Sequence, residues 1–172
     1  MEFLVKKAKE HHKPSFTQLI DLHMQAMYKT AYGMLGNDQD VADAIQDTIL
    51  TCWEKIGQLQ EAKYFKTWMI RILINKCNDI LRTKQKVVLV DTIPEIPAPD
   101  LGFSNLEWNE IMKVLSQKEQ VVVTLYYSEG FKTTEIAKML DITETAVRNR
   151  LARSRDKLAA KYYPELGKEQ AK

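Results

Sequence analysis

One stretch near the C-terminal end, from Thr145 to Arg155, has the residue types that read DNA. Laid out at 100° per residue, a helix here places five residues on one side and two arginines at its flanks. The five are Thr145, Arg148, Asn149, Ala152 and Arg153, and the flanking pair is Arg150 and Arg155. Arginine and asparagine form bidentate hydrogen bonds with guanine and adenine edges, and guanidinium groups suit phosphate oxygens. The pattern predicts a DNA-reading helix, with a solvated basic helix as the alternative.

Two helices joined by a tight turn must hold this surface, and the sequence from Thr133 to Leu158 predicts them. Asp141 tolerates the left-handed backbone that such a turn needs, and Thr143 can cap the second helix. Thr133 or Thr134 can cap the first. The apolar spacing predicts inward-facing residues at Ile136, Ala137 and Leu140 in the first helix and at Val147, Leu151, Ser154 and Leu158 in the second. Together these features are typical of a helix-turn-helix.

An acidic helical face is expected in the N-terminal half. Asp38 to Asp47 contains four acidic residues and no basic one, whereas Glu144 to Leu158 contains five basic residues and two acidic ones. Opposite an apolar stripe, the polar side of the acidic helix carries Asp43, Gln46 and Asp47. Carboxylates and an amide can bind a basic helical partner through charge-assisted hydrogen bonds, although an ordinary solvated face has the same composition.

The remaining pattern predicts an all-α chain: two small helical domains joined by an extended linker with three prolines, the second carrying the helix-turn-helix. Earlier helices are expected at about residues 15–36, with Ser15 as the cap, and at 38–56, 65–86, 106–115 and 118–128. We expect the first domain at 1–83, the linker at 84–105 and the second domain at 106–172. A short strand at Val87 to Val90 is the less favoured alternative within the linker.

Composition limits the possible functions. The chain has 172 residues, 45% of them hydrophobic, and a net charge of +2, which by itself indicates little about partners. No apolar run approaches the roughly 20 residues that span a bilayer, and the N-terminus lacks a signal-peptide core, so we expect a cytoplasmic protein without membrane insertion. Cys52 and Cys77 are expected to be buried free thiols. His11, His12 and His23 lack partners at metal-ligand spacing, so no metal or cofactor is expected.

Two sets of motifs resemble one family. The C-terminal half resembles region 4 of bacterial sigma factors in L-S-Q-K-E-Q-V-V-V-T-L-Y-Y-S-E-G-F-K-T-T-E-I-A-K-M-L and V-R-N-R-L-A-R-S-R-D-K-L. The N-terminal half resembles region 2 in A-D-A-I-Q-D-T-I-L-T-C-W and F-K-T-W-M-I-R-I-L-I-N-K-C-N-D-I-L-R. The short linker leaves no room for the extra domain of housekeeping sigma factors. The resemblance is therefore to the small extracytoplasmic-function (ECF) type, and it covers about Phe16 to Leu158.

The resemblance implies a non-catalytic specificity subunit of RNA polymerase that binds promoter DNA. In the family, region 4 reads the minus-35 element, which matches Arg148, Asn149, Ala152 and Arg153. Asp141 stands where a helix-turn-helix often has glycine. Ala152 is smaller than the residue that relatives often have, which suggests either contact with a thymine methyl group or a weaker contact. An anti-sigma factor, often membrane-anchored in this family, is implied as a partner.

Region 2 of the family binds the core polymerase and opens the minus-10 element, and the resemblance assigns these roles to three groups of residues. Asp43, Gln46 and Asp47 match the positions that bind the polymerase clamp. Melting requires capture of an unpaired base, for which the loop 57–66 offers Tyr64 to stack and Lys63 and Lys66 to hold phosphates. On the following helix, the polar edge contains Arg71, Asn75 and Asn78, while Phe65 and Trp68 are expected in the core.

Two other classes of protein compete with this interpretation. A helix-turn-helix regulator that binds an operator as a dimer would explain Thr133 to Leu158, but not the N-terminal motifs, and no dimerising heptad is present. A nucleic-acid enzyme is disfavoured because no catalytic residues are recognisable: there is no phosphate-binding glycine loop and no nucleophile beside a histidine. Asp43 and Asp47 could share a magnesium ion only with further ligands.

Overall fold

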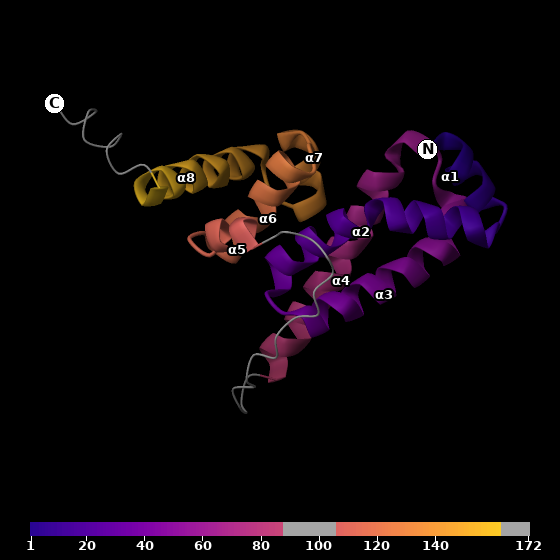
Figure 1. The fold of residues 1–172 in the computed structure, drawn as a ribbon, viewed down its shortest axis with the longest axis horizontal. Helices are drawn as coiled ribbons and strands as arrows, with labels where there is room; N and C mark the ends of the chain where they lie inside the picture. Colours follow the sequence, from indigo (N-terminus) through magenta and orange to yellow (C-terminus); the bar gives the residue numbers. More distant parts are fainter. Residues whose placement is uncertain (88–105, 163–172) are drawn as a thin grey trace. The chain divides into compact units, whose positions relative to one another are not determined.

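The computed structural model describes residues 1–87 and 106–162, and every regular element in these ranges is helical. The chain divides into two compact units, Met1–Ile96 and Pro97–Lys172. Figure 1 draws the helices of the first unit in indigo to magenta and those of the second in orange to yellow. The all-α, two-domain fold class predicted from the sequence is confirmed.

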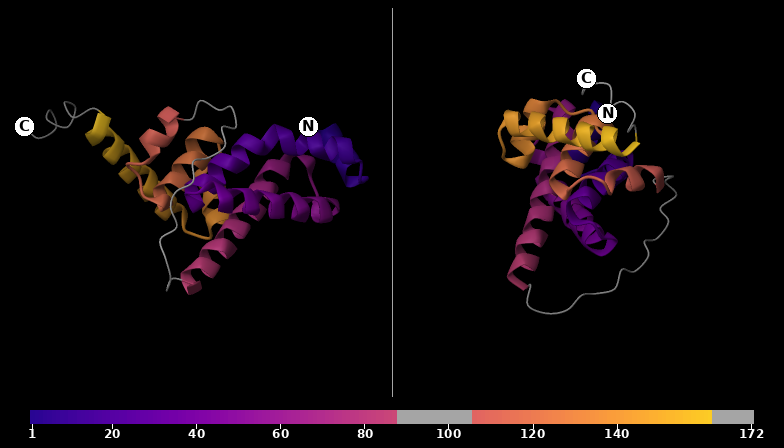
Figure 2. Two further views of the ribbon diagram at one scale, coloured as in Figure 1. Left: turned by 60° about the horizontal axis from the view of Figure 1, so that its bottom comes forward. Right: turned by 90° about the vertical axis from the view of Figure 1, so that its left-hand side faces the viewer.

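Within residues 1–87, the N-terminal unit has four α-helices and two 3₁₀ turns. They are α1 (Glu2–Lys9), α2 (Lys13–Leu35), α3 (Asp38–Lys55), η1 (Ile56–Gln58), η2 (Ala62–Tyr64) and α4 (Phe65–Val87). The three long helices, drawn from two further directions in Figure 2, pack against one another, and their apolar side chains form a continuous core. Leu19, Met27, Met69 and Leu73 are among its fully buried side chains. Burial of this stripe from each helix is what stabilises the bundle.

Local sequence signals define the turn between α2 and α3. Gly36 ends α2 in the left-handed conformation, with φ 72°, which glycine adopts without steric cost. Asn37 then caps α3, since its side-chain oxygen accepts the Asp40 backbone N–H at 3.0 Å. The predicted helix ranges, 15–36 and 38–56, agree with this turn. The predicted start of α2 was wrong: the cap is His12, whose Nδ1 accepts the Ser15 N–H, whereas Ser15 itself is buried inside the helix.

Helix α4 ends at Val87, close to the end of the predicted helix 65–86, and it includes Lys84, which was predicted to begin the linker. The Lys84 ammonium group binds the largely buried carboxylate of Asp40, which also accepts a hydrogen bond from Asn37 Nδ2 at 2.6 Å. This ion pair joins the end of α4 to the start of α3. From residue 88 onward, the predicted linker and the rest of the alternative strand at 87–90 lie outside the described residues.

The described part of the C-terminal unit, residues 106–162, has four α-helices and one π-helical turn. They are α5 (Leu106–Met112), α6 (Gln117–Val123), η3 (Thr124–Ser128), α7 (Thr133–Leu140) and α8 (Glu144–Tyr162). Helix α8 packs against both α6 and α7. The buried side chains of Val122, Leu125, Ile136 and Val147 form the centre of this small core.

The turn between α7 and α8 has the predicted chemistry. Asp141 is left-handed, with φ 52° and ψ 49°, and the Thr143 hydroxyl accepts the Ala146 backbone N–H at 3.1 Å. The predicted caps of α7 were wrong. The Lys132 backbone N–H at that helix start donates to the Glu135 carboxylate at 2.9 Å, and Thr133 lies inside the first turn. Met139 is buried in place of the predicted Leu140, which is half-buried.

A buried carboxylate connects helices α6 and α8 of the C-terminal unit. Glu119 in α6 accepts hydrogen bonds from the Ser116 N–H and from Lys157 Nζ in α8, each at 2.8 Å. Burial alone would raise the pKa of Glu119, but the hydrogen bonds from Lys157 and Ser116 outweigh it and hold the pKa below its ordinary value. The ionised form of Glu119 therefore stabilises the folded unit.

This carboxylate predicts acid sensitivity. Because its pKa is lower in the folded state, Glu119 stabilises the fold above its ordinary pKa, and this contribution is lost as the pH falls through the lowered pKa. Hydrogen exchange of α6 and α8 in the full chain, followed from pH 6 to pH 3, should record the loss. Glu119→Gln should flatten this pH dependence, and Lys157→Met should cost about 1–3 kcal/mol at neutral pH. A Glu119→Gln chain with unchanged acid sensitivity would contradict the assignment.

Both cysteines are free and buried, as predicted. Burial raises the pKa of each thiol to about 12. At neutral pH they are protonated, and they fill space within the N-terminal core.

Candidate nucleic-acid interface

The residues of the predicted DNA-reading surface lie on the side of α8 opposite its buried residues. Val147, Leu151 and Ser154 are buried, and Leu158 is half-buried. The side of the helix that faces the core is therefore the one that the spacing predicted. The opposite side of the helix carries the side chains that were predicted to contact DNA. Thr145, Arg148, Asn149, Arg153 and Arg155 are exposed, and Arg150 and Ala152 are half-buried. The helix thus presents guanidinium and amide groups on one continuous side.

A hydrogen-bonded group of three residues fixes the start of this surface. The Glu144 carboxylate accepts hydrogen bonds from Thr133 Oγ1 in α7 at 2.7 Å and from Arg148 Nη2 at 2.6 Å. Arg148 Nε adds a longer one at 3.2 Å. These hydrogen bonds lower the pKa of Glu144, and the one from Thr133 has the largest effect. Sequence analysis assigned no role to Glu144, although its i, i+4 spacing to Arg148 is the usual one for a helical ion pair.

The acidic face of α3 is also where the sequence placed it. Asp43, Gln46 and Asp47 are all exposed, opposite the buried Val41 and Ala44. The Asp47 carboxylate lies 3.8 Å from Lys76 Nζ of α4, a long and weak contact between an exposed acid and a half-buried lysine. The sequence analysis assigned no role to Leu50. This residue lies on the same face of α3 and is 61% exposed. An apolar side chain next to polar ones is suited to the centre of a protein contact.

The loop predicted to capture a base is built from η1 and η2, with its aromatic side chain outward. Tyr64 is 48% exposed, and Lys63 Nζ lies 4.9 Å from the centre of its ring. Lys63 also pairs with the Glu61 carboxylate at 2.7 Å. Lys66 is half-buried. Phe65 belongs to the core, as predicted, and Trp68 is half-buried with its ring 6.0 Å from that of Phe65.

A polar face runs along α4 from this loop. Arg71 and Asn75 are exposed and Asn78 is half-buried, at the i, i+4, i+7 spacing that places them on one side of the helix. Arg82 continues the row and pairs with Asp79 at 3.0 Å. The loop supplies an aromatic ring, and this face of α4 supplies amides and cations. Groups of these kinds bind single-stranded nucleic acid.

Within residues 1–87 and 106–162, no three His, Cys, Asp or Glu side chains come together as ligands for a metal ion. None of the helices described is both long and apolar enough to span a bilayer.

A two-unit helical protein with an outward-facing basic helix-turn-helix belongs to the class of DNA-binding transcription proteins, and comparison with known proteins identifies its family. The sigma-70 region 2 family model matches residues 19–87, and the sigma-70 region 4 model matches residues 106–158. The chain belongs to the sigma-70 family of RNA polymerase sigma factors, in its ECF group. The resemblance inferred from the sequence motifs is confirmed.

Relatives match over almost the whole chain. RNA polymerase sigma factor NccH of Alcaligenes xylosoxydans xylosoxydans is 29% identical, with 92% of each chain covered. The ECF RNA polymerase sigma factor SigW of Bacillus subtilis is 26% identical, covering 92% of this chain and 96% of SigW. Among solved structures, sigma factor RpoE in complex with the anti-sigma factor NepR from Bartonella quintana has a TM-score of 0.66 at 20% identity, covering 84% of this chain and 94% of RpoE. The similarity to that structure concerns the fold.

Proposed function

We propose that this chain is a specificity subunit of RNA polymerase that has no active site of its own and directs initiation to a defined set of promoters. It would bind the core enzyme through α3, recognise a minus-35 element through α8, and open the minus-10 element with the η1–η2 loop and α4. Its place of action would be the cytoplasm, with RNA polymerase.

The observation that carries the proposal is the presence of both sigma regions, in order, in one chain, each with its predicted polar residues facing outward. A dimeric regulator would need only the helix-turn-helix. It would leave the acidic face of α3 and the exposed Tyr64 without a role. The two faces have opposite charge, which suits a basic protein partner for one and DNA for the other.

An anti-sigma factor is the expected inhibitory partner. The RpoE structure holds the anti-sigma factor NepR, and the structure of CnrH, with a TM-score of 0.63 and 24% identity, contains the cytosolic domain of CnrY. We propose that a protein of this functional kind sequesters the chain until transcription is needed.

The direct test of the proposed function is transcription from genomic fragments. Purified chain added to core RNA polymerase should produce transcripts with a small set of start sites that core alone does not use. Mapping these start sites would also give the promoter sequence. If the mixture starts RNA no more selectively than core polymerase, the proposal is wrong; tight operator binding by a dimer of the isolated chain would favour the regulator instead.

Substitutions on α8 should separate base reading from phosphate binding. We expect Arg148→Ala and Arg153→Ala each to lower affinity for the promoter by about 1–3 kcal/mol, and to relax the preference at one base position, because each removes a base contact. Arg155→Ala is the matched control: as a phosphate contact, it should weaken all sequences alike and reduce the salt dependence of binding. Binding to a randomised minus-35 library measures both. Unchanged base preference in both variants would remove the assignment of α8.

A further inference from the structure

Helix α1 lies before residues 19–87, the part matched by the region 2 family model, yet it is built into the N-terminal unit. Val5 and Ala8 are buried, with 1% and no exposure respectively. The helix packs against α2 and against both 3₁₀ turns of the loop that follows α3. In Figures 1 and 2 the indigo helix stands beside the magenta loop. Helix α1 therefore supports this loop by packing directly against both of its 3₁₀ turns.

One polar contact ties α1 to the middle of the loop. Lys9 Nζ donates a hydrogen bond to the backbone oxygen of Leu59 at 2.8 Å, across 50 residues of sequence. Leu59 connects η1 to η2 in an extended conformation, and its side chain is buried. A charged donor on a partly buried carbonyl group makes a stronger bond than a neutral donor does. Lys9 therefore fixes the peptide at which the loop changes direction.

The loop has an anchored inner side and a free outer side. Ile56, Leu59 and Phe65 are buried, whereas Gln60 and Tyr64 are exposed. A backbone hydrogen bond of 3.1 Å from Tyr64 N to the Glu61 oxygen closes η2, directly after the segment that Lys9 holds. The direction of the Tyr64 ring thus depends on the peptide orientation between residues 59 and 61. A loop that is already ordered loses less conformational entropy when it captures a base.

We propose that Lys9 is a positioning residue for promoter opening: through the Leu59 carbonyl group, α1 holds the η1–η2 loop in the orientation that presents Tyr64 to an extruded base. This inference rests on the proposed role of the loop in the minus-10 element. It gives α1 a part in selecting the captured base, through its contact with the loop.

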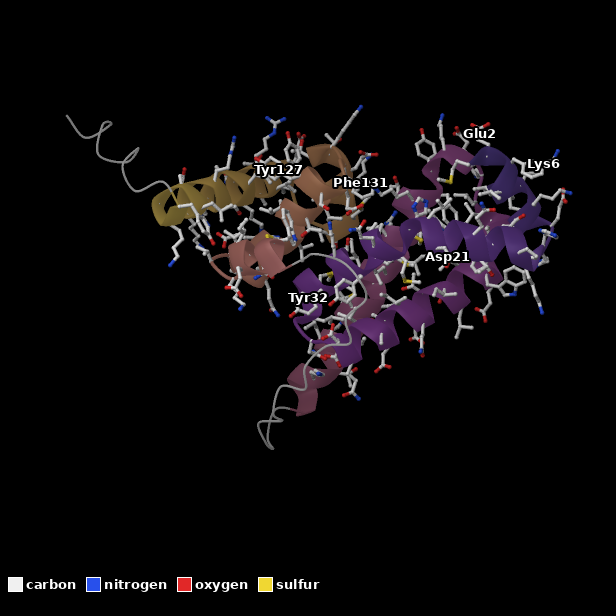
Figure 3. All side chains as sticks on the ribbon, viewed as in Figure 1. Glu2, Lys6, Asp21, Tyr32, Tyr127 and Phe131 are labelled. Atoms are coloured by element: carbon white, nitrogen blue, oxygen red, sulfur yellow. The ribbon has the colours of Figure 1, made fainter. Side chains whose placement is uncertain are left out.

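The experiment compares full-length variants in complex with core polymerase. Lys9→Met removes the donor and keeps the length of the side chain, Lys9→Arg keeps a donor, and Lys6→Met makes the same change on the exposed side of α1, where Figure 3 labels it. Promoters carrying each of the four bases at the captured position, with a fluorescent base analogue beside it, report the rate of opening. Thermal unfolding, core binding and minus-35 duplex binding are measured on the same samples.

We expect Lys9→Met to slow opening roughly tenfold, as for the loss of a hydrogen bond to a charged group, and to flatten the preference among the four bases. Core binding and minus-35 binding should stay unchanged, and the unfolding midpoint should fall by only a few degrees, as for the loss of a single hydrogen bond. Lys9→Arg should recover most of the rate, and Lys6→Met should match the wild-type chain.

A Tyr64→Ala variant distinguishes the two possible failures. If Tyr64→Ala slows opening while Lys9→Met retains the wild-type rate and base preference, the inference about α1 is overturned and the role of the loop stands. If Tyr64→Ala also opens promoters normally, the proposed role of the loop is wrong and the inference falls with it. A Lys9→Met chain that loses thermal stability and core binding as much as opening would make Lys9 purely structural, which also overturns the proposal.

Discussion

Leu151→Asp is expected to unfold the C-terminal unit. Leu151 is 5% exposed on the inner side of α8, the helix that packs against both α6 and α7. Removing its apolar side chain alone should cost about 2–5 kcal/mol, and a buried carboxylate without a partner adds to this. A small domain is typically stable by only about 5–15 kcal/mol in total. The single substitution is therefore sufficient to remove most of that stability.

Hydrogen exchange measured along the full chain tests this prediction unit by unit. Protection should disappear from residues 117–162 and persist in α2, α3 and α4, so that binding to core polymerase through α3 continues while promoter recognition is lost. Asn149→Asp is the control, because it introduces the same charge two residues away on the exposed side of α8. It should weaken DNA binding and leave the protection pattern intact. Normal protection of α8 in Leu151→Asp would show that this residue is not a core residue.

Asp47→Lys should greatly weaken binding to core polymerase. Asp47 lies at the centre of the acidic face of α3, with 64% of its side chain exposed, and the proposed partner surface is basic. Reversing the charge replaces an attraction with a like-charge contact, which costs several kcal/mol at a protein interface. We expect a loss of about 2–5 kcal/mol, or roughly 30-fold to several-thousand-fold in affinity.

The fold should survive this change, because the weak contact of Asp47 with Lys76 contributes little and the side chain points to solvent. Asp21→Lys is the matched control, since it makes the same charge change at an exposed position of α2, labelled in Figure 3. Titration of core polymerase with each variant measures the affinities, and thermal unfolding verifies the fold. Core binding by Asp47→Lys at wild-type strength would exclude α3 as the docking face.

Much of the local structure was predictable, because it depends on residues close together in the sequence. Gly36 and Asn37 end one helix and start the next through their own backbone preferences, and Asp141 and Thr143 do the same between α7 and α8. The inner side of α8 followed from spacing alone, since 3.6 residues per turn fixes which side chains share a side. The errors were local ambiguities: several residues near a helix start can cap it, and Lys132 and His12 did so in place of the threonines and Ser15.

The sequence by itself determined the fold class, the helix-turn-helix, the family and the exposure of most of the residues assigned to polymerase and DNA, since each depends on helical periodicity or on short motifs. Only the tertiary structure decided which distant groups meet. Lys9 reaches Leu59 across 50 residues, Lys157 reaches Glu119 across 38, and Thr133 reaches Glu144 from another helix. No periodicity encodes such pairs, because they depend on how whole helices pack, and packing is decided by the burial of entire apolar faces and not by the polar residues that it brings together.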